Sequence, residues 1–213
     1  MIIRDVMTPN PITLQDTDSI NTLIGLMRDR KLKKVPVLHG DKLVGIVTDK
    51  DLGKVSPSDA TTLSVFELNY VLSQTKIKDA MTKNVFTCTP DTFVEDAAVV
   101  MRDNRINALC IVENDKLVGI VTESDLFDSL IEMLGGRFHG NRFVIEVDNV
   151  PGTLGKLGAA MEERGINMSH FALVSASNEK AQLLIRTGLD SSLESAKTAL
   201  ENCGFKVISA SLK

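Results

Sequence analysis

Two short strings of the sequence place a threonine three residues before an aspartate. Residues 45–51 read Gly-Ile-Val-Thr-Asp-Lys-Asp, and residues 119–125 read Gly-Ile-Val-Thr-Glu-Ser-Asp. A carboxylate accepts hydrogen bonds from two neighbouring hydroxyl groups, such as those of a ribose, and a threonine hydroxyl can contact ribose or phosphate. A helix that begins at the threonine would also offer N–H groups to phosphate. The same spacing is typical of a helix cap, and spacing alone favours the cap over a ligand site.

Both strings belong to a longer internal repeat. Residues 3–52 align without a gap to residues 77–126, and 19 of the 50 aligned positions are identical. The identical positions in the first copy are Ile3, Asp5, Met7, Thr8, Asn10, Thr13, Met27, Arg28, Asp29, the run 41–48, Asp51 and Leu52. Two copies are too few for a solenoid, which needs about three. We therefore expect two half-modules that pack about a pseudo-two-fold axis, with paired clefts in which ligands tend to bind.

Each copy is predicted to fold as β-α-β-β-α. An extended opening at 11–14 or 85–88 precedes a helix with apolar residues at helical spacing. A β-rich hairpin follows and turns at 39–41 or 113–115, and a second helix opens at Thr48 or Thr122. The fold class is therefore mixed α/β (α+β).

The remaining chain predicts a connector and a second domain. Between the copies, Leu63, Phe66, Tyr70 and Leu72 suggest an amphipathic helix packed beside the repeats. Gly135, Gly136 and the polar residues that follow predict a domain boundary. From residue 143 the pattern is β-α-β-β-α-β, which is ferredoxin-like. The expected boundaries are 1–56 and 77–134 for the two copies, 57–76 for the connector, 135–142 for a linker and 143–213 for the last domain.

Composition and charge argue against several functional classes. The formal net charge is -4, and no run of Lys or Arg is longer than two residues, so nucleic acid is a poor partner. No apolar run approaches about 18 residues, and the first residues do not read as a signal peptide. Three cysteines without metal spacing suggest a reducing, cytoplasmic location. His39, His139 and His170 lack nearby ligands or catalytic partners, and no nucleophile elbow or phosphate-binding loop is present. We therefore expect no catalytic residue, no metal and no catalytic cofactor.

Residues 3–52 and 77–126 resemble two cystathionine-β-synthase (CBS) motifs in tandem. The resemblance rests on Asp5-Val6-Met7-Thr8 with Asp79-Ala80-Met81-Thr82, on Val35-Pro36-Val37 and on the two Gly-Ile-Val-Thr-x-x-Asp strings. It implies a regulatory pair that binds an adenine nucleotide, either AMP, ADP, ATP or S-adenosylmethionine. The residues implied to hold ribose and phosphate are Thr48, Asp51, Thr122 and Asp125.

The same resemblance implies two adenine pockets that differ from each other. The residues implied for one pocket are Ile12, Thr13, Val35 and Pro36, and those for the other are Phe86, Thr87, Leu109 and Cys110. Cys110 stands where the first copy has Pro36, and Asn107-Ala108 stands where it has Lys33-Lys34. Phosphate charge should therefore be matched better in one cleft than in the other.

Residues 143–208 resemble an ACT domain. The resemblance rests on residues 148–154, Asp-Asn-Val-Pro-Gly-Thr-Leu, and on residues 165–168, Gly-Ile-Asn-Met. It implies a pocket for an amino acid held by Asn149 and Asn167, with Gly152 in the loop between them. We expect the β-α-β connection to bring both amides to one rim. In the alternative, Asn149 only caps the helix and the domain only dimerises.

The order of two CBS motifs and one ACT domain resembles the acetoin-utilisation AcuB-like family. That resemblance implies a non-enzymatic sensor that forms a homodimer and acts on a partner protein which the sequence does not identify. The alternative is a structural or interaction dimer without a small-molecule ligand. A nucleotide hydrolase and a DNA-binding regulator are disfavoured, because the sequence shows neither an acidic or metal-binding cluster nor a basic surface.

Overall fold

The computed structural model describes residues 1–55 and 64–213. Contacts within the chain divide it into two compact units, Met1–Leu126 and Phe127–Lys213. The division falls inside helix α7 (Glu123–Met133). Leu63 of the predicted connector lies outside the described residues.

The first unit holds the two sequence copies, each with its own β-hairpin. In the first copy, β3 (Lys34–His39) pairs with β4 (Lys42–Thr48), and in the second β6 (Ala108–Glu113) pairs with β7 (Lys116–Thr122). The registers are equivalent, since Gly45 faces Val37 and Gly119 faces Ile111. A short parallel strand joins each hairpin, β2 (Leu14–Gln15) beside β3 and β5 (Thr87–Cys88) beside β6. The predicted hairpins are confirmed.

Two separate hydrophobic cores lie beneath these hairpins. Helix α2 (Ile20–Asp29) buries Ile20, Leu23 and Met27 against β3 and β4. Helix α6 (Val94–Asn104) buries the equivalent residues Val94, Ala97 and Met101 against β6 and β7. The helical spacing of these apolar residues places them on one face of each helix, as the sequence predicts.

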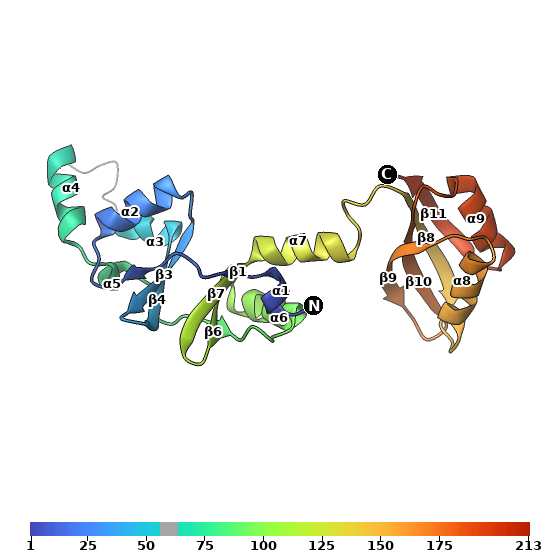
Figure 1. The fold of residues 1–213 in the computed structure, drawn as a ribbon, viewed down its shortest axis with the longest axis horizontal. Helices are drawn as coiled ribbons and strands as arrows, with labels where there is room; N and C mark the ends of the chain where they lie inside the picture. Colours follow the sequence, from blue (N-terminus) through green and yellow to red (C-terminus); the bar gives the residue numbers. More distant parts are fainter. Residues whose placement is uncertain (56–63) are drawn as a thin grey trace. The chain divides into compact units, whose positions relative to one another are not determined.

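The first few residues of each copy pack against the other copy. Helix α1 (Ile3–Val6) buries Ile3 in the core of the second copy, and α5 (Ile77–Ala80) buries Ile77 in the core of the first. Strand β1 (Thr8–Pro9) pairs with β7, so the second sheet runs β1-β7-β6-β5. The equivalent contact joins Thr82 to Ile46 through two backbone hydrogen bonds. These paired exchanges tie the two copies into one unit (Figure 1).

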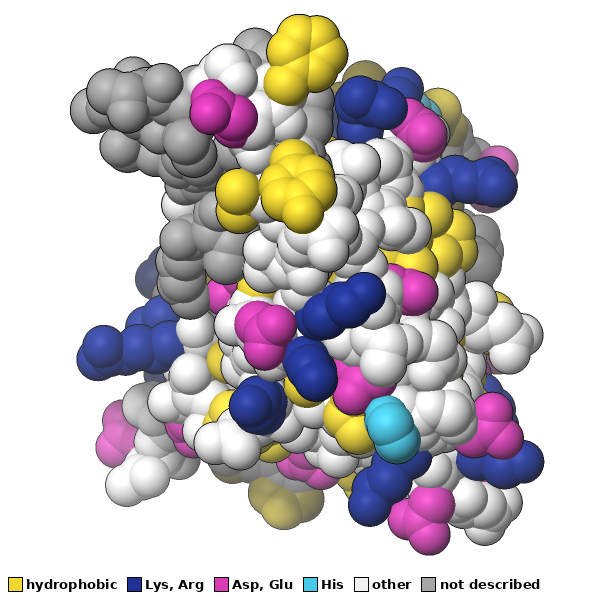
Figure 2. All heavy atoms as spheres, turned by 90° about the vertical axis from the view of Figure 1, so that its left-hand side faces the viewer, with side chains coloured by type: hydrophobic (Ala, Val, Ile, Leu, Met, Phe, Trp, Pro, Cys, Tyr) yellow, Lys and Arg dark blue, Asp and Glu magenta, His cyan; other side chains and the backbone are white. Residues whose placement is uncertain are grey.

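The connector contains a helix, but its aromatic residues do not pack on the repeats. Helix α4 (Val65–Gln74) contacts α2, and Leu72 is buried in the first core. Phe66 and Tyr70 are 87% and 67% exposed, which corrects the expectation that they share the buried face with Leu72. Residues 66 and 70 are one helical turn apart, whereas 72 points to the other side. Figure 2 shows exposed hydrophobic side chains at the top of the face on which α4 lies.

The second unit has the predicted β-α-β-β-α-β order. Its elements are β8 (Asn141–Asp148), α8 (Thr153–Glu162), β9 (Met168–Ala176), β10 (Lys180–Thr187), α9 (Leu193–Asn202) and β11 (Lys206–Leu212). The sheet order is β11-β8-β10-β9, and all neighbouring strands are antiparallel. Helices α8 and α9 cover one face of this sheet (Figure 1), where Phe143, Ile145 and Leu200 are fully buried. The arrangement is ferredoxin-like.

Candidate functional site

Asp51 and Thr48 form a closed local pair at the start of helix α3 (Asp49–Val55). The Asp51 Oδ2 atom accepts a hydrogen bond from the Thr48 backbone N–H at 3.0 Å and from its hydroxyl at 2.8 Å. The Asp51 side chain belongs to a residue only 5% exposed. The hydrogen bond from the Thr48 N–H to the Asp51 carboxylate is one of the two bonds of the predicted helix cap. The carboxylate is fixed in place before any ligand arrives.

The second copy repeats this geometry in a more open setting. Asp125 Oδ2 accepts from the backbone N–H and the hydroxyl of Thr122, each at 2.8 Å. Asp125 is half-buried, whereas Asp51 is buried. The two copies thus share the same local chemistry, and burial distinguishes them.

A cleft of about 590 Å³ lies beside the first pair and draws its walls from both copies. Thr48 and Asp51 come from the first copy, and Phe86 comes from the second. The other lining residues are Lys34, Ile46, Asp49, Lys50, Thr82, Asn84, Val85, Met101, Arg102, Arg105, Ile106, Asn107, Ala108 and Glu123. We refer to this space as the Asp51 cleft. Its volume is in the range of ordinary small-ligand sites, which hold about 300–1,000 Å³.

The Asp51 cleft combines an apolar wall with many charges. Its basic residues are Lys34, Lys50, Arg102 and Arg105, and its acidic residues are Asp49, Asp51 and Glu123. Basic side chains can pair with phosphate oxygens, and an apolar wall suits a base. The two arginines were not among the predicted site residues. Their only sequence signal is that Arg102 matches Arg28 in the repeat.

The structure brings some of the predicted residues to this cleft and separates others from it. Thr122 and Asp125 do not line the Asp51 cleft, although their neighbour Glu123 does. Thr13 lines a cavity of about 310 Å³, Thr87 lines one of about 570 Å³ near the hairpin turns, and Ile12 is 42% exposed.

Four predicted adenine-pocket residues lie inside the protein. Val35, Leu109 and Cys110 are fully buried, and Pro36 is also buried. Val35 and Leu109 belong to the two separate cores. These side chains already fill their surroundings, so a ligand would meet them only through the backbone.

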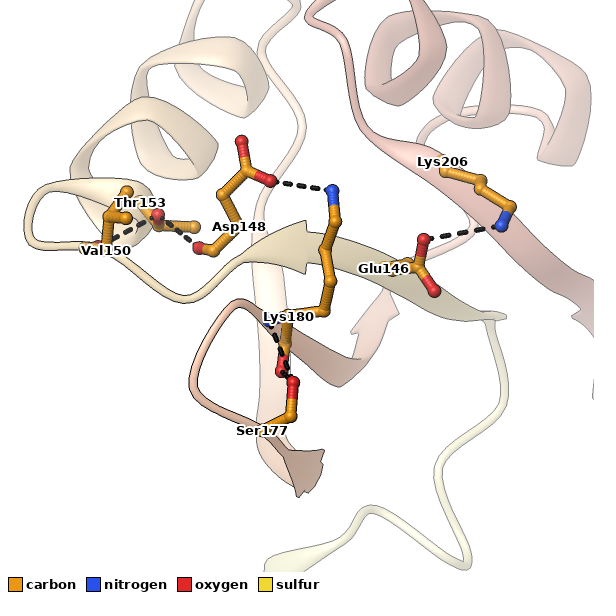
Figure 3. Close-up of polar contacts among 7 residues, drawn as sticks. All are labelled: Glu146, Asp148, Val150, Thr153, Ser177, Lys180 and Lys206. Atoms are coloured by element: carbon orange, nitrogen blue, oxygen red, sulfur yellow. Dashed lines mark hydrogen bonds and ion pairs between the residues drawn. The ribbon is translucent and has the colours of Figure 1, made fainter.

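Asn149 does not cap helix α8. Its side-chain amide donates to the Ser177 carbonyl at 2.6 Å, and the residue before the helix is Gly152, which has φ +89° and no side-chain cap. Instead the Thr153 hydroxyl donates to the Asp148 and Val150 carbonyls (Figure 3). The alternative in which Asn149 only caps the helix is therefore wrong, because the amide is used to hold the β9–β10 turn.

Asn149 and Asn167 do not share a rim in one chain, contrary to expectation. Both β8 and β9 are antiparallel to β10, so they are parallel to each other. Asn149 follows the end of β8, and Asn167 precedes the start of β9, so they lie at opposite ends of the sheet. Strands of this length separate their ends by about 25 Å. Asn167 lines a cavity of about 410 Å³ with residues of α8, and Asn149 does not.

The acidic residues near Asn149 are already paired. Lys180 Nζ lies 2.7 Å from Asp148 Oδ1, and Lys206 Nζ lies 3.3 Å from Glu146 Oε1 (Figure 3). The hydrogen bond and charge of Lys180 lower the pKa of the Asp148 carboxyl.

The described residues contain neither a metal-binding cluster nor a helix suited to cross a membrane. Within 1–55 and 64–213, no group of three or more His, Cys, Asp or Glu side chains is placed to hold a metal. In the same ranges no helix has the length and apolar character needed to cross a membrane.

Comparison with known sequences identifies relatives of different length. An uncharacterised protein of Methanocaldococcus jannaschii, MJ1426, is 35% identical over 155 residues, which are 62% of this chain and 92% of the relative. An inosine-5'-monophosphate dehydrogenase of Korarchaeum cryptofilum is 35% identical over 127 residues, which are 59% of this chain and 22% of the enzyme. A homoserine O-acetyltransferase of Methanohalobium evestigatum is 29% identical over 58% of this chain and 23% of the enzyme. The chain thus spans less than a quarter of either enzyme.

Solved structures of similar fold include two ligand complexes. A Vibrio cholerae protein assigned to acetoin utilization (AcuB) is 28% identical with a TM-score of 0.54, covering 64% of this chain and 95% of that one. The CBS domain pair of MJ0100, bound to 5'-methylthioadenosine and S-adenosyl-L-methionine, is 25% identical with a TM-score of 0.51, covering 64% and 98%. CBSX2 bound to AMP is 28% identical with a TM-score of 0.51, covering 62% and 97%.

The family model of the CBS domain matches residues 3–57 and 77–132, which together are more than half of the chain. These ranges contain both Thr-x-x-Asp strings and both hairpins. The chain therefore belongs to the CBS domain family and carries two CBS domains in tandem.

Proposed function

We propose that this protein is a non-enzymatic regulatory sensor that binds an adenine nucleotide in the Asp51 cleft. The observation that carries the proposal is the buried Asp51 carboxylate, held by Thr48 at the edge of a cleft that basic side chains also line. The AMP complex of CBSX2 and the S-adenosyl-L-methionine complex of MJ0100 support it, because both are similar CBS folds.

In this proposal each part of the nucleotide meets matching chemistry. The ribose hydroxyls donate to Asp51, and the phosphate or other polar tail meets Lys34, Lys50, Arg102 and Arg105. The adenine lies toward the second-copy wall at Val85 and Phe86. Because the walls come from both copies, a bound nucleotide would favour one arrangement of the two copies over another. It can shift the equilibrium between two such arrangements only if it binds one of them more tightly than the other.

The second pair, Thr122 and Asp125, is proposed as a weaker site. Asp125 is more exposed than Asp51, so water competes better for its carboxylate. The first-copy residues Ile12, Thr13, Val35 and Pro36 are proposed to approach that ligand, the last two through their backbone. Phe86, which lines the Asp51 cleft, is assigned to the first site, and Leu109 and Cys110 are proposed to approach its ligand through their backbone. Thr87 is assigned to the same site, although it lines a different cavity in the structure.

The second unit is proposed to be an ACT domain that joins two chains and binds an amino acid. Because Asn149 and Asn167 lie at opposite ends of the sheet, one chain cannot clamp a small ligand between them. In a homodimer, Asn149 and Gly152 of one subunit can meet Asn167 of the other. The likeness to the AcuB structure supports an AcuB-like role in acetoin utilisation, exerted on a regulated partner protein.

The competing function is a structural or interaction dimer without a ligand. Calorimetric titration of the nucleotide-stripped chain with AMP, ADP, ATP and S-adenosylmethionine separates the two. Saturable binding of at least one of them supports the sensor. The absence of binding by all four would contradict it and favour the interaction dimer.

A further inference from the structure

Three basic side chains form one row on the sheet face of the second unit that α8 and α9 do not cover. Arg186 of β10 lies directly opposite Arg142 of β8 and His170 of β9. Residues directly opposite in neighbouring strands point to the same face. Their sequence neighbours Phe143 and Ile185 point into the helix-covered core, so the row lies on the other face.

Arg186 is buried beneath the segment that follows α7. It is 6% exposed, and its Nε donates to the Leu134 carbonyl at 2.8 Å. A Cβ atom on Gly135 would lie 2.8 Å from Arg186 Cδ and 2.7 Å from the His170 ring. Gly135 also has φ +63°, which favours glycine. The backbone at Leu134 and Gly135 therefore closes directly over the arginine and the histidine.

One guanidinium nitrogen of Arg186 is not used in a hydrogen bond among the described residues. Its Nη1 atom is buried and has no hydrogen-bond partner in the part of the chain that the structure describes. The ion pairs found in the described part of this unit are Asp128–Arg137, Asp148–Lys180, Glu146–Lys206 and Lys197–Glu201. Neither Arg186 nor Arg142 is among them. A buried, charged donor without an acceptor is costly, and a second arginine beside it adds repulsion.

Arg142 and His170 lie on either side of Arg186 in the neighbouring strands and carry further hydrogen-bond donors. Burial and then the charge of Arg142 lower the pKa of the Arg186 guanidinium. His170 is oriented by its Nδ1 contact with the Ser169 hydroxyl at 3.1 Å and by the ring of Phe138, whose centroid is 5.2 Å away. Its Nε2 atom has no partner among the described residues. Two arginines and one imidazole thus lie side by side on one face of the sheet, and the ion pairs found among the described residues of this unit include none of them.

We propose that Arg142, Arg186 and His170 form a binding site for a small oxyanion, a carboxylate or a phosphate group, that accepts a hydrogen bond from Arg186 Nη1. The planar guanidinium suits either group, because it offers two parallel N–H donors to two oxygens. The site uses none of the residues proposed for nucleotide or amino acid binding. The proposed anion site can therefore be tested independently of the proposed nucleotide and amino acid sites.

The test uses calorimetric titration of the full chain with inorganic phosphate and, separately, with acetate, with sodium chloride adjusted to keep ionic strength constant. The central variant is Arg142→Gln, because Arg142 is half-buried and no hydrogen bond or ion pair of its side chain is found within residues 1–55 and 64–213. The control is Arg164→Gln, which removes the same charge from an exposed position of the same unit. We expect binding of at least one anion, weakened at least about tenfold by Arg142→Gln and unchanged by Arg164→Gln.

The two probes identify the group that is bound, since the tighter anion shows whether phosphate or carboxylate is preferred. A second readout is the Arg186 Nε–Hε signal in nuclear magnetic resonance spectra, which the bound anion should shift in the parent and not in Arg142→Gln. Binding that survives Arg142→Gln unchanged, or no binding of either anion, would overturn the proposal.

Discussion

Gly119 lies so close to Met7 that a Cβ atom on Gly119 would sit 2.5 Å from the methionine sulfur. The equivalent contact in the repeat joins Gly45 to Met81, with similar crowding. Each methionine follows the short helix that one copy gives to the other. The glycines therefore allow the exchanged segments to lie flat on the partner hairpin.

Replacing Gly119 by alanine should destabilise the protein. The added methyl group must displace the Met7 side chain, and it would also lie 3.3 Å from the Thr8 carbonyl oxygen. Overpacking of this kind costs about 1–3 kcal/mol. Denaturant unfolding of Gly119→Ala measures this loss, and Met7→Ala combined with it should recover part of it.

Gly25→Ala is the matched control. Gly25 is in helix α2, and its added Cβ would meet no atom within 4 Å. Because alanine favours helix over glycine, this variant should be as stable as the parent or slightly more so. Equal losses for Gly25→Ala and Gly119→Ala would show that the close contact with Met7 is not the cause.

The three cysteines should differ in reactivity. Burial raises the pKa of the Cys110 thiol to about 12 and also raises that of Cys88, whereas Cys203 is exposed. Thiol reagents react with the thiolate. We expect one fast thiol in the native chain, lost in Cys203→Ser, and Cys110 reacting only after unfolding. A fast phase that persists in Cys203→Ser would contradict this burial pattern.

Asn149→Ala should loosen the β9–β10 turn rather than fray helix α8. The variant loses the hydrogen bond to the Ser177 carbonyl, worth about 0.5–1.5 kcal/mol. Asn178→Ala serves as the control, because it removes a neighbouring amide for which no side-chain hydrogen bond is found among the described residues. A thermal-shift screen of the twenty amino acids tests the proposed ligand. An amino acid that stabilises the parent and Asn178→Ala but not Asn149→Ala supports the site. No stabilisation by any amino acid leaves the second unit as a dimerisation domain.

The edge strand β9 should mediate dimer formation. It ends the sheet and exposes Phe171, Leu173 and Val174, and natural proteins cover such edges. Sedimentation should find a dimer of the parent and of Leu189→Lys, whose leucine is equally exposed away from the sheet. Leu173→Lys should weaken the dimer. A parent monomer near 23.2 kDa would rule out both this edge and the CBS pair as interfaces.

The local elements could be predicted from the sequence, because their signals lie within a few residues. The hairpins follow from β-rich runs around turn residues, and the Thr48–Asp51 hydrogen bonds follow from helical spacing. The exchange of α1 and α5 could not be predicted in this way. Ile3 and Ile77 look like ordinary apolar residues, yet Ile3 packs with core residues from 94 to 121 and Ile77 packs with core residues from 20 to 72. Only tertiary packing decides which copy buries them.

Part of the candidate site also depends on tertiary packing and could not be predicted from local sequence patterns. Arg102 and Arg105, at the end of α6, line the Asp51 cleft together with first-copy residues such as Lys34, and no local pattern reports that proximity. Asn149 and Asn167 were expected at one rim of the sheet, and this expectation was wrong for a different reason. In parallel strands joined by a helix, the end of one strand and the start of the next lie at opposite ends of the sheet. That rule would have separated the two amides.

In the proposed function, Asp51 anchors the ribose of an adenine nucleotide. The most direct measurement is calorimetric titration of the tightest-binding nucleotide into Asp51→Asn, which can still accept hydrogen bonds from Thr48 and so preserves the local fold. Asp96→Ala, an exposed carboxylate at the start of α6, is the control. Poorly paired ribose hydroxyls cost about 1–3 kcal/mol, so we predict affinity reduced about 5- to 150-fold in Asp51→Asn and unchanged in Asp96→Ala. Parental affinity in a folded Asp51→Asn variant would contradict the account.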